Sequence, residues 1–407
     1  MSGPSSRGFW PVRDLPVVLW LLSAVVVALQ AAVLPAPRWL LIHVLLLGAV
    51  SHAILVWSRH FADALLHTAP SELERRRQSR RLVLQNLGVV AVLAGVVQGR
   101  WPVTLAGAAA VGSAVAWHGA SLALLLRRAL PSRFGPTVRY YVAAACFLPC
   151  GAALGTALAR GLDDPLDEQA ALAHVAVNVL GWVGLTVVGT LVTLWPTMLR
   201  TRILEGSERA ARRALPVLAG AVVVTAGGAL MDLRPLAALG LAGYLAGLGM
   251  VADAFVTTAR GKRPSSFPTW SVLAGVLWLL GSLSALTVGV LTATSWAEVA
   301  DRLDGVAPLL AAGFGAQLLL GALSYLVPMV LGGGPTPVRA ANAVVERAGA
   351  LRVGVTNAAL LVCVLPVPTA VRDLCSALVL AALATFLPLL LMAVRASRNA
   401  RPHRVPA

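Results

Sequence analysis

Long apolar runs divide this chain into thirteen short segments whose content of basic residues alternates. The seven odd-numbered segments carry two to six Lys and Arg residues each, and the six even-numbered segments between them carry one each. The basic-rich segments therefore hold 27 of the 33 Lys and Arg residues. Because short positive loops resist translocation, the alternation predicts a chain that crosses a bilayer twelve times, with both termini in the cytoplasm.

The composition agrees with this topology and excludes a soluble enzyme. The chain is 58% hydrophobic and 12% charged, whereas soluble domains are about 25% charged. The first apolar run, residues 15–34, is longer than the apolar core of a secretory signal, so we expect an uncleaved helix in the cell membrane. The net charge of +16 follows from the loop asymmetry. Few aromatic residues accompany the basic residues, so nucleic acid is not an expected partner.

The fold class predicted is all-α, a polytopic membrane protein with about 12 transmembrane helices that form a single integral membrane domain over residues 1–407. Each apolar run is close to the length of about 20 residues that spans a hydrocarbon core. The predicted helices are 15–34, 39–60, 82–99, 102–126, 139–160, 170–199, 214–230, 235–258, 269–292, 305–331, 350–367 and 370–396.

Three of these helices share a short pattern, which predicts an internal repeat. Residues 45–52 (LLLGAVSH) match residues 318–325 (LLLGALSY), and residues 178–184 (NVLGWVG) are a looser match. The copies lie in the second, sixth and tenth predicted helices, a period of four helices, so we expect three four-helix units around a pseudo-threefold axis. The alternative is chance, because strings of Leu, Gly and Ala recur in apolar helices, and small residues also favour close helix packing.

Two histidines are the leading candidates for a cofactor or metal site. His43 and His174 each lie about four residues inside the outer end of a predicted helix, and hence at the same depth. Neutral imidazole is the usual protein ligand of haem iron and copper. Asn178 follows His174 by one helical turn, which predicts that its side chain orients the imidazole.

His52 and His118 are further metal-ligand candidates. His52 lies about 180° around the helix from His43, so one helix cannot direct both rings to one metal. His118 lies in the inner half of its helix. For each, ordinary hydrogen bonding inside a helix bundle is the alternative, and His60 and His67 are expected at the membrane interface. The catalytic residues stay unknown, because no Ser/His/Asp set, His-Glu-x-x-His or Cys-x-x-Cys occurs.

Two cytoplasmic segments also carry predictions. The linker that follows residue 60 is expected to turn in solvent at residues 71–74, and its arginines are expected to contact anionic inner-leaflet lipids. Those arginines are Arg75, Arg76, Arg77, Arg80 and Arg81. The second segment, residues 332–347, begins Gly-Gly-Gly-Pro-Thr-Pro and is expected to be a loop.

Residues 174–183 (HVAVNVLGWV) resemble the His-x-His-x-Asn-Leu-Leu-Gly-Trp-Val helix of proteins related to subunit I of haem–copper oxidases, and similar helices occur in NnrS-like haem and copper membrane proteins. Residues 43–61 look like the corresponding early helix, and residues 317–328 resemble a third. The resemblance implies twelve crossings, His43 as the outer haem ligand and His174 as an early metal position.

The chain departs from that family in its ligands. Ala176 replaces the second histidine of the pattern, the helix 214–230 has no histidine pair, and the helix 305–331 has no histidine. A complete oxygen-reducing centre is therefore excluded. The resemblance still implies a haem or copper protein with a redox, gas-handling or metal-handling role and a redox partner subunit. The alternative is a permease or structural membrane protein on the same scaffold, without a metal centre.

Overall fold

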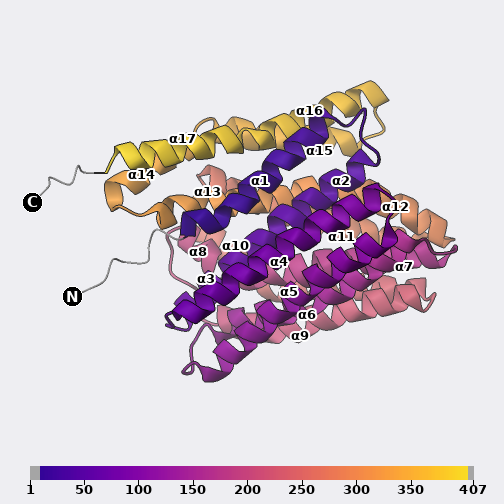
Figure 1. The fold of residues 1–407 in the computed structure, drawn as a ribbon, viewed down its shortest axis with the longest axis horizontal. Helices are drawn as coiled ribbons and strands as arrows, with labels where there is room; N and C mark the ends of the chain where they lie inside the picture. Colours follow the sequence, from indigo (N-terminus) through magenta and orange to yellow (C-terminus); the bar gives the residue numbers. More distant parts are fainter. Residues whose placement is uncertain (1–9, 402–407) are drawn as a thin grey trace, which may run out of the picture. The chain divides into compact units, whose positions relative to one another are not determined.

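Long apolar helices make up almost the whole chain (Figure 1). The structure is a computed structural model that describes residues 10–401, and it contains no strand within that range. Within that range eleven helical segments of 24 to 36 residues, one of them interrupted by the turn between Val345 and Gly349, are long and apolar enough to cross a membrane. The helix α1 (Trp10–Leu29) precedes them. The predicted all-α, polytopic membrane class is thus confirmed.

Each predicted crossing coincides with a helical segment, although α4 begins ten residues and α9 seven residues before the predicted start, and three of the long segments include a π-helix, labelled η. The elements after α1 are α2 (Pro37–His43), η2 (Val44–Val50), α3 (Ser51–Leu65), α4 (Glu72–Val97), α5 (Trp101–Arg128), α6 (Gly135–Arg160), α7 (Leu166–Val175), η3 (Ala176–Gly184), α8 (Leu185–Met198), α9 (Ser207–Leu230), α10 (Arg234–Gly261), α11 (Phe267–Thr292), α12 (Trp296–Pro308), η4 (Leu309–Ala316), α13 (Gln317–Leu331), α14 (Pro335–Val345), α15 (Gly349–Val364), α16 (Thr369–Ala384) and α17 (Phe386–Asn399).

The chain divides into two compact units. The first comprises the chain up to Leu45, Pro264–Leu279 and the chain from Ala311 onward. The second comprises Leu46–Arg263 and Leu280–Leu310. In the second unit α4 packs along α5, and α9 packs along α10, each pair forming an antiparallel hairpin.

Two segments expected to be irregular are helical. The solvated turn expected at residues 71–74 is instead the start of α4, because the Ser71 hydroxyl accepts a hydrogen bond from the Glu74 amide at 3.2 Å and caps the helix. The loop expected over 332–347 contains α14. Its three glycines, with φ between 62° and 97°, and the turn that starts at residue 346 are irregular. The prolines that follow lie in the first turn of α14, where a missing amide hydrogen costs nothing.

The three helices of the predicted repeat each contain a π-helical segment, of seven, nine and eight residues. Gly48, Gly181 and Gly313 are the fifth, sixth and fifth residues of η2, η3 and η4 and lie 133 and 132 positions apart. This register differs from the sequence match of residues 45–52 with 318–325, in which Gly48 aligns with Gly321. The four-helix spacing of the copies remains, and the pseudo-threefold arrangement stays a prediction.

Side chains satisfy backbone carbonyls in all three π-segments. A π-helix displaces carbonyls from the regular hydrogen-bond ladder, and in hydrocarbon an unsatisfied carbonyl costs several kcal/mol. Gln85 Nε2 donates to Leu47 O at 3.0 Å, and Tyr244 Oη donates to Leu180 O at 2.9 Å. In η4 the donor is local, from Gln317 Nε2 to Gly313 O at 3.0 Å.

The two hairpins of the second unit are copies of one structure. Helices α5 and α10 are both 28 residues long and begin 133 positions apart, at Trp101 and Arg234. A Cβ atom added to Gly95 would lie 2.5 Å from the Thr104 amide nitrogen, and one added to Gly228 would lie 2.5 Å from the Ala237 amide nitrogen. The same close backbone approach therefore recurs 133 residues later, which supports the repeat independently of the π-helices.

Candidate functional site

His174 and Asn178 form a local unit on α7 and η3. His174 Nδ1 lies 3.0 Å from Gly151 O of α6, and Asn178 Nδ2 lies 3.3 Å from the same nitrogen. Asn178 also donates to His174 O at 2.9 Å. Gly151 O only accepts and is the nearer partner, so Nδ1 donates to it when Nδ1 carries the ring proton, and the lone pair is then on Nε2. In that tautomer the Asn178 amide nitrogen, which is itself a donor, contacts the ring at 3.3 Å without a hydrogen bond to it, and Asn178 is held by its bond to His174 O.

Two glycines on α6 make room for this unit. A Cβ atom at Gly151 would overlap the Asn178 amide, and one at Gly155 would lie 2.8 Å from His174 Cε1. The imidazole therefore lies directly against the α6 backbone. No sequence signal pointed to Gly151 or Gly155, because the partner of α7 is a property of the tertiary fold.

His43 is held in the same protonation form within its own helix. Its Nδ1 lies 2.8 Å from Trp39 O, one turn earlier, and its ring stacks on the Trp39 indole with centroids 4.0 Å apart. Nδ1 is again the donor, so the lone pair is on Nε2. Ligating histidines characteristically donate the other ring nitrogen to a carbonyl or carboxylate in this way. His43 belongs to the first compact unit and His174 to the second.

The His52 imidazole is the opposite tautomer. It is fully buried in α3, and Asn86 Nδ2 of α4 lies 2.8 Å from its Nδ1. An amide nitrogen donates, so His52 Nδ1 accepts and Nε2 carries the proton. The first unit has an analogous pair, in which Asn357 Nδ2 donates to Gln317 Oε1 at 2.9 Å. His52 and Gln317 both follow the aligned π-helix glycine by four residues, which favours the structural alternative for His52.

His118 lies in α5, where it is 1% exposed, and its Nε2 is 2.8 Å from Ser58 Oγ of α3. Its Nδ1 makes no hydrogen bond to any residue in the described range. None of the four candidate ligands, His43, His52, His118 and His174, belongs to a set of three His, Cys, Asp or Glu side chains suited to a metal, since residues 10–401 contain no such set. His60 packs edge-on against Trp57.

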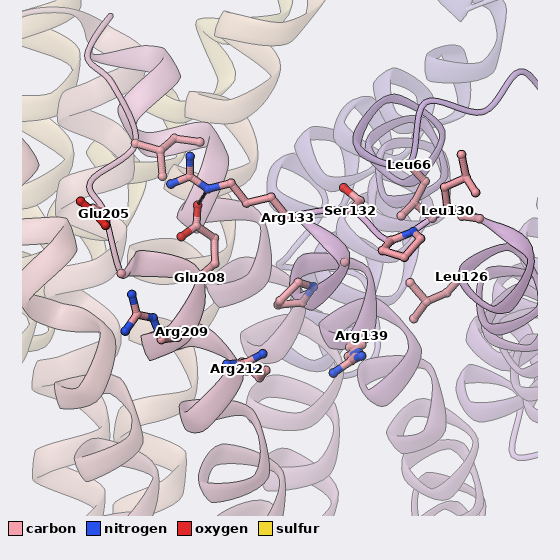
Figure 2. A pocket seen from close by; sticks show the side chains of 16 residues that line it. Leu66, Leu126, Leu130, Ser132, Arg133, Arg139, Glu205, Glu208, Arg209 and Arg212 are labelled. Carbon is pink, nitrogen blue, oxygen red and sulfur yellow. Dashed lines mark ion pairs between the residues drawn. The ribbon is translucent and has the colours of Figure 1, made fainter.

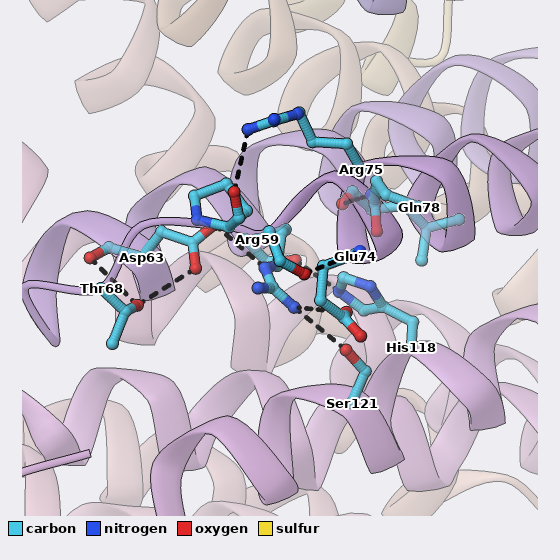
Figure 3. A network of polar contacts seen from close by, with 12 residues as sticks. Arg59, Asp63, Thr68, Glu74, Arg75, Gln78, His118 and Ser121 are labelled. Carbon is cyan, nitrogen blue, oxygen red and sulfur yellow. Dashed lines mark hydrogen bonds and ion pairs between the residues drawn. The ribbon is translucent and has the colours of Figure 1, made fainter. Parts of the chain in front are cut away.

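A buried charge network beside His118 was not anticipated from the sequence (Figure 3). The Arg59 guanidinium lies 3.0 Å from Asp63, 3.1 Å from Ser121 Oγ and 3.4 Å from Glu74. Arg59 and Asp63 are both buried. Their i, i+4 spacing, which places two residues on one helix face, was the available signal.

The lipid contact predicted for Arg75–Arg81 needs correction at Arg81. Its side chain is fully buried, 5.5 Å from the Trp117 ring and 3.9 Å from Glu74, because α4 begins earlier than expected and turns this residue toward α5. Arg75 and Arg76 form ion pairs with Glu72, and Arg77 forms one with Glu74. Two glutamates of the same helix therefore pair with part of this cluster, which keeps an excess of three positive charges.

Comparison with known proteins gives no family. No protein-family model matches the chain, and no curated protein matches it significantly.

Proposed function

We propose that this chain is a cell-membrane protein, with both termini cytoplasmic, that binds haem or copper at His43 and at His174 and has a redox, gas-handling or metal-handling role. The main support is the form of the two imidazoles. Each has Nδ1 hydrogen-bonded to a backbone carbonyl, which places the lone pair on Nε2, the atom that ligates iron or copper.

The position of the two histidines adds a second line of support. His43 directly precedes η2, and His174 precedes η3 by two residues. Single π-turns in α-helices are frequent at functional sites. Asn178 would orient His174, and Trp39 would fix the plane of His43. The bound group would supply reversible electron uptake or an open position for a diatomic gas.

The test is the absorption spectrum and metal content of the detergent-solubilised protein after expression with haem and copper supplied. We expect a Soret band or stoichiometric copper in the unaltered protein, and a loss of at least tenfold in His43→Ala and in His174→Ala. His67→Asn serves as the control, because His67 has φ 54° and Asn tolerates that conformation. Unchanged metal content in both alanine variants would refute the assignment.

A permease is the second candidate, and the buried network of Arg59, Asp63 and Glu74 favours it. Charged side chains inside membrane helices often mark ion or substrate pathways. Asp63→Asn would then abolish substrate-dependent proton or ion flux in proteoliposomes while leaving metal content unchanged. Loss of bound metal without any flux defect in the His43 and His174 variants would decide for the first candidate.

A further inference from the structure

A cavity of about 850 Å³ opens in the second unit where the connection between α5 and α6 meets that between α8 and α9 (Figure 2). Both connections belong to basic-rich segments, so the cavity lies on the side predicted to be cytoplasmic. It lies at the ends of four membrane-crossing helices, which is the level of the lipid headgroups. The proposed haem or copper site does not use it.

The lining of the cavity carries an excess of positive charge. Four arginines line it, and two glutamates oppose them. The lining charges are Arg133, Arg139, Arg209, Arg212, Glu205 and Glu208. Glu208 forms an ion pair with Arg133, which leaves three arginines against Glu205.

These three arginines differ from the cluster at the start of α4. Arg139, Arg209 and Arg212 are exposed and form no ion pair with any residue between 10 and 401. Figure 2 shows Arg139 of α6 and Arg212 of α9 lining the same space from neighbouring helices. Exposed guanidinium groups that converge on one cavity are suited to a phosphate, which they can bind bidentately.

An apolar edge borders the charged lining. Leu126, Leu130 and Ile203 also line the cavity, and Leu130 is 85% exposed. An exposed leucine beside an arginine-lined cavity at a helix end presents an apolar surface next to a cationic one. That combination suits an amphiphile with a phosphate and acyl chains better than a soluble anion.

We propose that this cavity binds the headgroup phosphate of an anionic phospholipid, with the acyl chains against Leu126 and Leu130. Arg139, Arg209 and Arg212 would bind the phosphate, while Glu208 holds Arg133 at the rim. Basic pockets at the cytoplasmic ends of membrane helices bind such headgroups, and each arginine near the surface contributes about 1 kcal/mol.

The experiment measures phosphatidylglycerol binding to the full-length protein in neutral detergent by native mass spectrometry, with phosphatidylcholine as reference. R139Q/R209Q/R212Q should weaken phosphatidylglycerol binding about a hundredfold, at roughly fivefold per arginine. R75Q/R76Q/R77Q removes the same formal charge from arginines already paired with Glu72 and Glu74, and should change binding less than threefold. Equal losses in the two triple variants would overturn the proposal.

A second variant distinguishes a lipid from free phosphate. Leu130→Ser alters an exposed side chain and leaves folding intact, and it should weaken phosphatidylglycerol binding about tenfold through the lost acyl contact. Inorganic phosphate should not displace the lipid at millimolar concentration. Displacement of the lipid by phosphate alone, or phosphatidylglycerol binding unaffected by Leu130→Ser, would contradict a lipid site.

Discussion

At the scale of single residues, the environment of His174 depends on two positions of α6 at which glycine leaves room for its ring and for Asn178. Gly151 and Gly155 allow the Asn178 amide and the imidazole to lie against the α6 backbone. The helical spacing predicted that Asn178 would contact His174, because both lie on one face of one helix. It could not predict Gly151 or Gly155, because sequence periodicity does not identify which helix packs against that face.

Gly151→Ala should therefore destabilise the protein by roughly 1–3 kcal/mol, the usual cost of overpacking a tight contact, and should also lower any bound metal. The measurement is thermal unfolding in detergent, with metal analysis of the same samples. Gly227→Ala on α9 is the matched control, because a Cβ atom there would contact nothing within 4 Å. That variant should gain about 0.5–1 kcal/mol from helix propensity. Equal stability of the two variants would contradict the packing argument.

The depth of His52 in the membrane could be predicted from the sequence, but its hydrogen-bond partner could not. Its position near mid-membrane followed from the apolar pattern, which favoured a hydrogen-bonded packing role over a ligand role. The Asn86 amide nitrogen, 2.8 Å from His52 Nδ1, supports the packing role. Asn86 lies 34 positions away on another helix, and local spacing carries no information about such a contact.

At the scale of elements, the helix bounds were predictable because hydropathy and charge change together at the membrane surface. The π-segments η2, η3 and η4 were not, because they contain the same Leu, Val, Gly and Ala residues as the regular helices around them. Their position depends on side chains elsewhere in the fold, such as Gln85 and Tyr244, that donate to the displaced carbonyls.

Asp232, in the turn between α9 and α10, combines a left-handed backbone with two side-chain hydrogen bonds. Asp232 has φ 62°, and at the equivalent turn between α4 and α5 the residue is Gly99, with φ 63°. The Asp232 carboxylate accepts hydrogen bonds from Gln169 and Trp296, which tether α7 and α12 to the turn. Asp232→Ala should lose these bonds and retain an unfavourable left-handed backbone, at a cost of roughly 2–4 kcal/mol.

Asp232→Gly separates the two effects. It removes the same hydrogen bonds but accepts positive φ, so it should be about 1 kcal/mol more stable than Asp232→Ala in chemical denaturation. Equal stability of the alanine and glycine variants would show that backbone conformation at this turn contributes nothing.

At the scale of the whole molecule, the alternation of Lys and Arg along the chain predicts twelve crossings. Within the described residues eleven helical segments are long and apolar enough to cross a membrane, and α1 is a further helix of 20 residues. Crossings can be predicted one by one because the loops that flank each apolar run carry their own charge signal. The grouping of helices into two compact units could not be read in that way, since it depends on contacts between distant segments.

An even number of crossings predicts that both termini face the same compartment. Reporter fusions at the N-terminus and at the C-terminus should both show cytoplasmic activity, and a cysteine introduced at residue 163 should react with a membrane-impermeant thiol reagent from outside intact cells. If the two termini were found in opposite compartments, the number of crossings would be odd, and the sides assigned to part of the chain would have to be exchanged.

The hairpins α4–α5 and α9–α10 share their helix spacing but differ in the polarity of their interior. The copies keep the same glycine contacts 133 residues apart, whereas Asn86 in one copy is replaced by Ala219 in the other. Backbone architecture and interior polarity are therefore specified by different positions. A polar side chain can therefore be added to or removed from the interior of one hairpin without disturbing the glycine contacts that set the spacing of its two helices.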